Sequence, residues 1–324
     1  MKTTTRLALG MSLFSIGTVA LADGWDPTSQ ASAIGSIANT RHNLTVSYST
    51  LGSVMDLARN NYGAICVYCH TPHGGNKQIQ APLWNRTINP GNYTIYDKPT
   101  TLMRPIGLPG PNSLTCLSCH DGTIAIDSVL NMPGSGLSPI GGGANNQVGT
   151  SNMDFLNTWA ASGAGTGPSG DHFALGPELG STNSGCAFCH TAGNPFGAPD
   201  YSAFMLGTDL RNDHPIGVQY PVSFGTDTDF NEPNVVIPGR MSFFDGNGNN
   251  HADKNEVRLY DTGDGPEVEC ASCHDPHGIP SNGAGTRFNP SFLRVNNGIA
   301  GTHEGTSGIV SAGPSALCLT CHAK

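Results

Sequence analysis

The ten cysteines of this 324-residue chain all lie in five copies of one short pattern, Cys-x-x-Cys-His. The spacing is that of c-type haem attachment, in which both cysteines form thioethers with the porphyrin and the histidine binds the iron as proximal ligand. Two cysteines three residues apart lie on one side of a helical turn, as this attachment requires. The sequence therefore predicts five covalently bound haem c groups. The residues that would hold them are Cys66, Cys69 and His70; Cys116, Cys119 and His120; Cys186, Cys189 and His190; Cys270, Cys273 and His274; and Cys318, Cys321 and His322.

Cysteine pairs at this spacing have other uses, namely zinc binding, a redox-active disulfide and a disulfide that staples a loop. Every pair in this chain is followed directly by a histidine, and no cysteine is left unpaired. Neither zinc ribbons nor disulfides need a histidine at that fifth position each time. The pattern therefore favours haem over the three alternatives.

Seven of the twelve histidines lie outside the motifs, and five of them are needed if every iron has two axial ligands. His73 and His277 each stand three residues beyond a proximal histidine, across a proline. Neither can reach the opposite face of its own haem, so each is predicted to bind a neighbouring one. For His73 this is the haem of the second motif, and for His277 that of the fifth. Haems linked in this way lie close together, which suits electron hopping.

The distal ligands of the other haems are predicted from histidines that precede each motif. His42 is the candidate for the first haem, and His214, within Asp213–Gly217, is the candidate for the fourth. For the middle haem the choice lies between His172 and His303, and His172 is the closer to the motif in sequence.

Residues 1–22 are typical of a secretory signal peptide. Lys2 and Arg6 form a short basic region, an apolar stretch follows over residues 7–20, and Ala20-Leu21-Ala22 fits the small-residue cleavage site. Covalent haem attachment in bacteria takes place outside the cytoplasmic membrane, in agreement with such a signal. We therefore predict an exported protein, either periplasmic or extracellular at the cell surface. No later segment approaches the ~20 apolar residues that cross a bilayer, so no transmembrane segment is predicted.

The composition combines 43 glycines and 23 prolines with only 12% charged residues, and the formal net charge is −9. The negative charge disfavours nucleic-acid binding and favours basic redox partners or metal surfaces. A chain this rich in glycine and proline is ordinarily rich in loops. The predicted fold class is that of a multihaem cytochrome c, with mostly irregular loops, few short helices and little strand, wrapped around a chain of stacked haems.

The outer motifs form two similar pairs, which indicates an internal duplication. Residues Cys69–Gly74 resemble Cys273–Gly278, and Leu114–His120 resemble Ala316–His322. The segment between the two pairs holds the middle motif and a stretch rich in glycine, serine and asparagine that is typical of a flexible loop. The predicted regions are the signal peptide at 1–22, an N-terminal two-haem module at 23–130, an inserted segment with the middle haem at 131–209, and a C-terminal two-haem module at 210–324.

Residues 245–256 fit the oxygen-ligand spacing of an EF-hand-type calcium loop. Asn250 stands where such loops usually have glycine, and asparagine is the next most tolerant of a left-handed backbone. The alternative is an asparagine- and glycine-rich turn that binds nothing. The candidate calcium ligands are Asp245, Asn247, Asn249, Asp253 and Glu256.

The haem motifs resemble those of bacterial multihaem c-type cytochromes with doubled Cys-x-x-Cys-His patterns, which are common in metal-reducing bacteria. The Cys-His-Thr-Pro-His segment also resembles the doublet of extracellular cytochromes that polymerise into filaments, in which one haem takes its distal histidine from the adjacent subunit. The resemblance implies low-potential haems with two histidine ligands and electron transfer without substrate chemistry. The stretches that carry it are Cys66–Gly74, Leu114–Gly122, Asp213–Gly217, Glu269–Gly278 and Leu317–His322.

The predicted function is that of an electron conduit rather than an enzyme, serving periplasmic or extracellular respiration. The expected partners are other redox proteins, such as quinone-linked cytochromes, and external acceptors such as metal oxides or electrodes. One alternative is a pentahaem oxidoreductase whose middle iron is open to substrate. The known pentahaem nitrite reductases replace one motif histidine by lysine, and all five motifs here end in histidine. The other alternative is a subunit of a conductive filament, a homopolymer in which His303 or His42 binds a haem of the next subunit.

Overall fold

The structure is a computed structural model, and its description covers thirteen stretches of the chain. They are residues 37–45, 62, 64–79, 81, 83–98, 104–131, 174–176, 185–188, 190–193, 200–224, 228–279, 289–295 and 315–323. The predicted signal peptide, most of the inserted segment, Cys189, His172 and His303 lie outside these residues.

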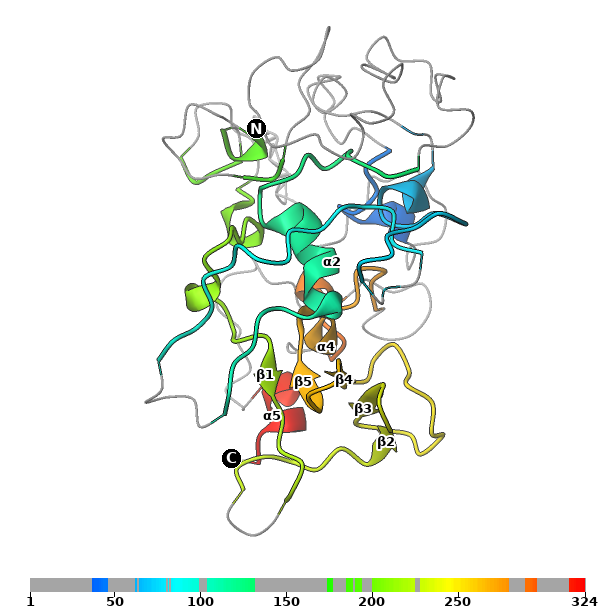
Figure 1. The fold of residues 1–324 in the computed structure, drawn as a ribbon, viewed down its shortest axis with the longest axis vertical. Coiled ribbons are helices and arrows are strands. Elements are labelled where there is room, and N and C mark those ends of the chain that lie inside the picture. The colour runs from blue at the N-terminus through cyan, green and yellow to red at the C-terminus, as the bar shows by residue number, and fades with distance from the viewer. Residues whose placement is uncertain are drawn as a thin grey trace, which may run out of the picture.

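A five-stranded antiparallel sheet forms the lower part of the molecule in Figure 1, with the strands in the order β1-β5-β4-β3-β2. The central strand β4 pairs with β3 through Met241 and Tyr260, and with β5 through Tyr260 and Glu267. Phe243 of β3 and Leu259 of β4 are both fully buried, and the register places their side chains on opposite faces of the sheet. The strands are β1 (Val218–Gln219), β2 (Val235–Ile237), β3 (Met241–Phe243), β4 (Arg258–Asp261) and β5 (Pro266–Val268).

This sheet contradicts the predicted fold class of irregular loops with little strand wrapped around a chain of stacked haems. The prediction was wrong because it took the glycines as signs of loop. Several of them instead close tight turns between short strands, where a left-handed backbone is needed. Gly239 (φ 67°) lies between β2 and β3, and Gly263 (φ 124°) and Gly265 (φ 99°) lie between β4 and β5. In addition, strands of two to four residues are too short for an alternation of apolar and polar residues to be recognised in the sequence.

Three α-helices and six 3₁₀ turns are present among the described residues, and all five haem motifs lie on or overlap one of them. The longest helix, α2, begins at Pro111, a residue that suits the first helical turn because its missing N–H has no partner there anyway. In Figure 1 α2 lies at the centre of the molecule, directly above α4. The helices are α2 (Pro111–His120), α4 (Cys270–Cys273) and α5 (Ala316–Cys321), and the 3₁₀ turns are Ile37–Asn39, Ile65–Tyr68, Cys186–Phe188, Ser202–Phe204, Leu210–Asn212 and Pro290–Phe292.

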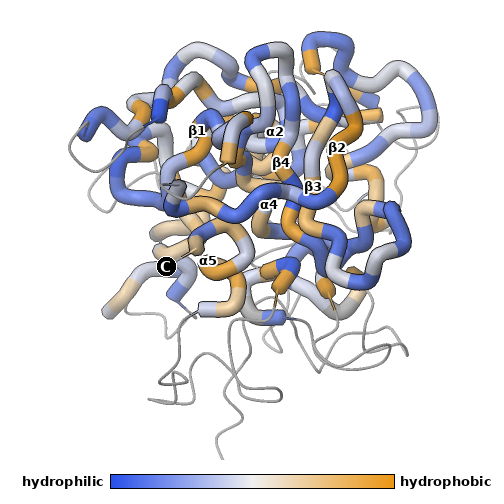
Figure 2. The backbone as a smooth tube through the Cα atoms, turned by 90° about the horizontal axis from the view of Figure 1, so that it is seen from below, coloured by the Kyte–Doolittle hydropathy of each residue, from blue (hydrophilic) through white to orange (hydrophobic). Residues whose placement is uncertain are grey.

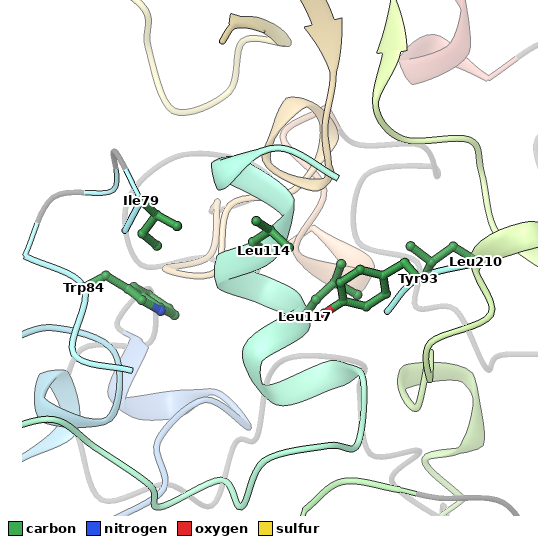
Figure 3. Packing of buried hydrophobic residues seen from close by; sticks show 6 residues of the cluster. All are labelled: Ile79, Trp84, Tyr93, Leu114, Leu117 and Leu210. Carbon is green, nitrogen blue, oxygen red and sulfur yellow. The ribbon is translucent and has the colours of Figure 1, made fainter. Parts of the chain in front are cut away.

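Apolar side chains gather around α2, which carries the second haem motif. Leu114 and Leu117 lie three residues apart, about one turn of the helix (Figure 3), and both are buried. They join side chains from the loops before the helix and from the 3₁₀ turn at Leu210. The members of this cluster drawn in Figure 3 are Ile79, Trp84, Tyr93, Leu114, Leu117 and Leu210.

Apolar residues also reach the surface at the edge of the sheet. All three residues of β2 are apolar, and the strand forms an orange stretch in Figure 2. Val236 of this strand is 63% exposed.

None of the helices within the described ranges has the length and hydrophobicity that a bilayer-spanning helix requires.

Candidate haem-binding sites

The haem motifs share one local geometry. In four of them the backbone N–H of the histidine donates a hydrogen bond to the carbonyl oxygen of the first cysteine, so that both cysteines and the histidine belong to one closed turn. The second motif has the same residues at the carboxyl end of α2. None of the cysteines that the structure describes is in a disulfide. The closing distances are 2.7 Å for His70 to Cys66, 3.0 Å for His190 to Cys186, 3.0 Å for His274 to Cys270 and 2.8 Å for His322 to Cys318.

The second cysteine of several motifs is a neutral thiol in apolar surroundings. Burial raises the pKa of Cys69 to about 12, that of Cys273 to about 11 and that of Cys321 to about 12. A redox-active Cys-x-x-Cys pair works through a thiolate whose pKa is lowered. The pKa values of these three second cysteines are shifted in the opposite direction, whereas that of Cys270, the first cysteine of the fourth motif, is lowered.

His42 lies against the histidine of the second motif, not the first. The ring centres of His42 and His120 are 6.2 Å apart and the rings are nearly perpendicular, at 80°. His42 Nδ1 lies 2.9 Å from the Pro276 carbonyl oxygen, and His120 Nδ1 lies 2.7 Å from that of Phe204. Burial, followed by the nearby His120, lowers the pKa of His42 to about 4, and burial also lowers the pKa of His120. Both rings are therefore neutral at physiological pH, the state that binds a metal.

His277 lies against the histidine of the first motif, although it was predicted to serve the fifth. The rings of His70 and His277 are 6.2 Å apart between centres and nearly parallel, at 7°. His277 Nδ1 lies 2.9 Å from Asp275 Oδ1. The structure thus places two of the predicted distal histidines beside motif histidines, with a different pairing from the one expected.

The spacing within these two pairs suits an iron between the rings. Two imidazoles that bind opposite sides of one metal, each through Nε2 at ~2 Å, hold their ring centres about 6 Å apart. A hydrogen bond at Nδ1 leaves Nε2 as the ligating nitrogen and fixes the ring orientation. Nδ1 is engaged in this way in His42, His120 and His277. The residues present therefore fit haem with two axial histidines.

The histidine of the fourth motif also has its Nδ1 within hydrogen-bond distance of a backbone carbonyl oxygen. His274 Nδ1 lies 2.7 Å from the carbonyl oxygen of Ser291. Burial lowers the pKa of His274, and the charges of neighbouring groups, His214 among them, lower it further. His214 thus lies within electrostatic reach of the histidine that it was predicted to face.

The other predicted ligands have different surroundings. His190 of the middle motif stacks on Tyr201 at 4.2 Å between ring centres, and His322 of the fifth lies beside Phe230 at 5.0 Å. His73 is exposed at the surface. The two candidates for the middle haem, His172 and His303, lie outside the described residues.

A buried carboxyl group joins the helices of the second and fourth motifs. Glu269, directly before Cys270, accepts a hydrogen bond from the N–H of Gly110 (3.0 Å) and one from the hydroxyl of Ser113. The Ser113 oxygen in turn accepts the N–H of Cys270 (2.9 Å). The Glu269 carboxyl group therefore binds the start of α2, and the Ser113 hydroxyl group of α2 binds the start of α4. The Cys116 and Cys270 thiols share a hydrogen bond, which raises the pKa of Cys116 and lowers that of Cys270.

The first and fourth motifs are each hydrogen-bonded to a three-residue segment later in the chain, here called the return segment. The return segments are residues 83–85 for the first motif and 292–294 for the fourth. In each, the residue after the motif histidine donates its N–H to the first return residue, and the third return residue donates back to the second cysteine. Leu83 (φ 52°) and Phe292 (φ 60°) share a left-handed backbone. The hydrogen bonds are Thr71 to Leu83 (2.9 Å) and Asn85 to Cys69 (2.9 Å) in one segment, and Asp275 to Phe292 (2.9 Å) and Arg294 to Cys273 (2.7 Å) in the other.

Arg86 is a structural residue of this region that the sequence did not single out. It is fully buried and donates five hydrogen bonds, two to Ser118 of α2 and three to carbonyl oxygens at residues 125–128. The guanidinium thus ties the second motif to the loop that follows it. In the sequence, the feature that could have identified Arg86 is its charge, because it directly follows Trp84-Asn85 in a chain with few charged residues.

The candidate calcium loop is closed by its own hydrogen bonds. Asp245 accepts backbone N–H groups from three loop residues, and Glu256 accepts those of Gly246 (2.8 Å) and Asp253 (2.9 Å). The side chains of Asn247 and Asn249 both donate to Asp253 Oδ2. These bonds hold the loop without an ion, so calcium binding stays a prediction.

Within the described ranges, no group of three or more histidine, cysteine, aspartate and glutamate side chains is arranged to hold a metal ion. A structural zinc site needs four such ligands. The described motifs therefore do not form one.

The chain matches no family model, and no curated protein is significantly similar to it. The functional assignment thus depends on the motifs and on the geometry of their histidines.

Proposed function

We propose that this protein is an exported c-type cytochrome that carries five haems and conducts electrons. The observation that carries the proposal is the pairing of motif histidines with distant histidines, His70 with His277 and His120 with His42, at 6.2 Å in both cases. Five attachment motifs, which use every cysteine of the chain, support it further, and none of the cysteines that the structure describes is in a disulfide.

The residues of the chain would bind and orient the haems. Each cysteine pair would hold one porphyrin through two thioether bonds, and the motif histidine would supply one ligand to the iron. His277 and His42, which lie beside two of the motif histidines, would supply the second ligand to two of the irons, and the hydrogen bond at Nδ1 would raise the basicity of Nε2. Haem, when bound, would supply iron that changes by one electron between the ferric and ferrous states. An iron with two imidazole ligands would have no position for a substrate, so electron transfer is the chemistry that such a site supports.

In this proposal the electrons enter from a reduced redox protein and leave to an oxidised acceptor, one electron per haem, with no bond made or broken. Export through the predicted signal peptide would place the protein in the periplasm or at the cell surface. The negative charge of the chain favours partners with basic surfaces. Metal oxides and electrodes outside the cell are the other proposed electron acceptors.

Mass spectrometry and visible spectroscopy of the purified mature protein test the proposal. We expect five added haem masses, and a ferric spectrum without a high-spin component. Replacing Cys66 and Cys69 by alanine is the matched control and should remove one haem mass only. A colourless protein, or one that contains zinc or disulfides at the motifs, would refute the proposal. Stoichiometric binding of carbon monoxide to one ferrous haem would instead favour the oxidoreductase alternative.

A further inference from the structure

We infer that the segment Cys270–His277 joins the two halves of the chain through haem iron. His274 binds the haem of the fourth motif, and His277, three residues later, binds the haem of the first motif as its distal ligand. The inference rests on the proposed function and adds to it the pairing of ligands and irons.

The ring geometry is the first support for this pairing. His70 and His277 belong to opposite halves of the chain, yet their rings lie parallel at 6.2 Å between centres. The fifth motif, for which His277 was expected, has Phe230 beside its histidine, at 5.0 Å between ring centres. His277 is thus placed for the first haem.

The second support is the way His277 is held. Its side chain is 51% exposed, but its Nδ1 is bonded to Asp275, whose side chain is almost completely buried. Asp275 is itself fixed by Arg294, 3.6 Å away, and by its N–H bond to Phe292. A buried carboxylate that bonds Nδ1 orients an imidazole for ligation through Nε2. His277 therefore has the supporting residues of a metal ligand rather than those of a free surface histidine.

The same segment also contacts the second haem site. The Pro276 carbonyl oxygen lies 2.9 Å from Nδ1 of His42, the candidate distal ligand of the second haem. At the other end of the segment, the Cys270 N–H donates to the hydroxyl oxygen of Ser113 on α2, the helix of the second motif, at 2.9 Å. The haems of the first, second and fourth motifs would therefore meet at residues 270–277. Electrons that pass between the two halves would cross here, because transfer falls off steeply with distance.

Spectroscopy of paired variants tests the inference. His277→Ala should convert one of the five haems from low spin to high spin, because that iron loses its sixth ligand. In a Cys66→Ala/Cys69→Ala background, which lacks the first haem, His277→Ala should produce no high-spin signal. In a Cys318→Ala/Cys321→Ala background the signal should persist. His251→Ala, which removes an exposed histidine of the 245–256 loop, is the control and should leave all haems low spin.

The opposite pattern would overturn the inference: a high-spin signal that persists without the first haem and disappears without the fifth. An entirely low-spin His277→Ala protein would also overturn it. Either result removes the His70–His277 pair from the support for the proposed function, which then stands on the five motifs and on the His120–His42 pair. A wild-type protein without haem ends both proposals.

If His277→Ala does not accumulate, His277→Met provides a second test. Histidine–methionine ligation raises the potential of a haem relative to two histidines. One haem should then shift to higher potential, and the shift should be absent when Cys66 and Cys69 are alanine. A shift that survives in that background would contradict the pairing.

Discussion

Glu269 shows how one residue can link two haem motifs. Its side chain is 1% exposed and bonds to Gly110 and Ser113 at the start of α2, while its own backbone starts α4. Burial raises the pKa of its carboxyl group to about 7, against the partly opposing hydrogen bonds from Ser113 and Gly110. The helices of the second and fourth motifs are therefore held together by a group that titrates near neutral pH.

Glu269→Gln should flatten the pH dependence of stability. The folded-state pKa lies above the unfolded value of 4.5, so the contribution of Glu269 is fully present below pH 4.5 and is lost as the pH rises through 7. The loss in the free energy of unfolding is about 3 kcal/mol over that interval. Denaturant unfolding at pH 4.5 and pH 8 measures it. Glu232→Gln, at an exposed position, is the control. An unchanged pH slope in Glu269→Gln would show that the carboxyl group ionises freely in the folded protein.

The identities of the candidate iron ligands were predictable at the residue scale, but their pairing was not. The motif pattern and the number of spare histidines singled out His42 and His277. Which iron each serves depends on the path of the chain over long distances. His277 was assigned to the nearest following motif, and the structure brings it to the most distant preceding one. Local spacing carries no information about such a contact.

At the scale of elements, the sheet edge near β1 depends on a close approach of two glycines. The Gly107 N–H donates to the Gly217 carbonyl oxygen at 2.7 Å, and the Gly217 N–H donates to Val268 of β5 at 2.8 Å. Gly217 has a left-handed backbone, with φ of 68°. It follows His214 by three residues, so this turn also fixes the candidate distal ligand of the fourth haem.

Gly217→Ala should destabilise the protein more than Gly207→Ala does. Both glycines have positive φ, so both substitutions cost about 1 kcal/mol in backbone strain. A Cβ at Gly217 would lie 2.6 Å from the Gly107 oxygen, whereas one at Gly207 meets nothing within 4 Å. The steric overlap should add roughly 2 kcal/mol. Urea unfolding of the two variants isolates this term. Equal losses would mean that the segment around Gly107 moves away without cost.

The elements were harder to predict than the motifs because the strands are very short. The sequence similarity of residues 69–74 to 273–278 is accompanied by equivalent hydrogen bonds to their return segments. The return segments are Leu83-Trp84-Asn85 and Phe292-Leu293-Arg294, and no position of one has the same residue as the equivalent position of the other. Their equivalence lies in backbone shape and hydrogen bonding, which unrelated side chains can satisfy.

At the scale of the whole molecule, hydrogen bonds connect the two predicted two-haem modules. Glu269 and Cys270 of the C-terminal module contact Ser113 and Cys116 of the N-terminal one, and Pro276 contacts His42. The modules thus share an interface that contains attachment residues of both. An electron that enters either half has a short route to the other if the haems bind as proposed.

The charge of the whole molecule should set how fast partners deliver electrons to it. With a formal net charge of −9, the chain attracts basic redox proteins over long range, and salt screens that attraction. The second-order rate constant for reduction by a small basic cytochrome should therefore fall about tenfold between low salt and ~0.3 M ionic strength. Stopped-flow absorbance of the haem bands measures this rate. An uncharged small-molecule reductant is the control and should show little salt dependence. A rate with the basic partner that stays constant or rises with salt would mean that docking depends on local apolar contacts, for which exposed Val236 on β2 is a candidate.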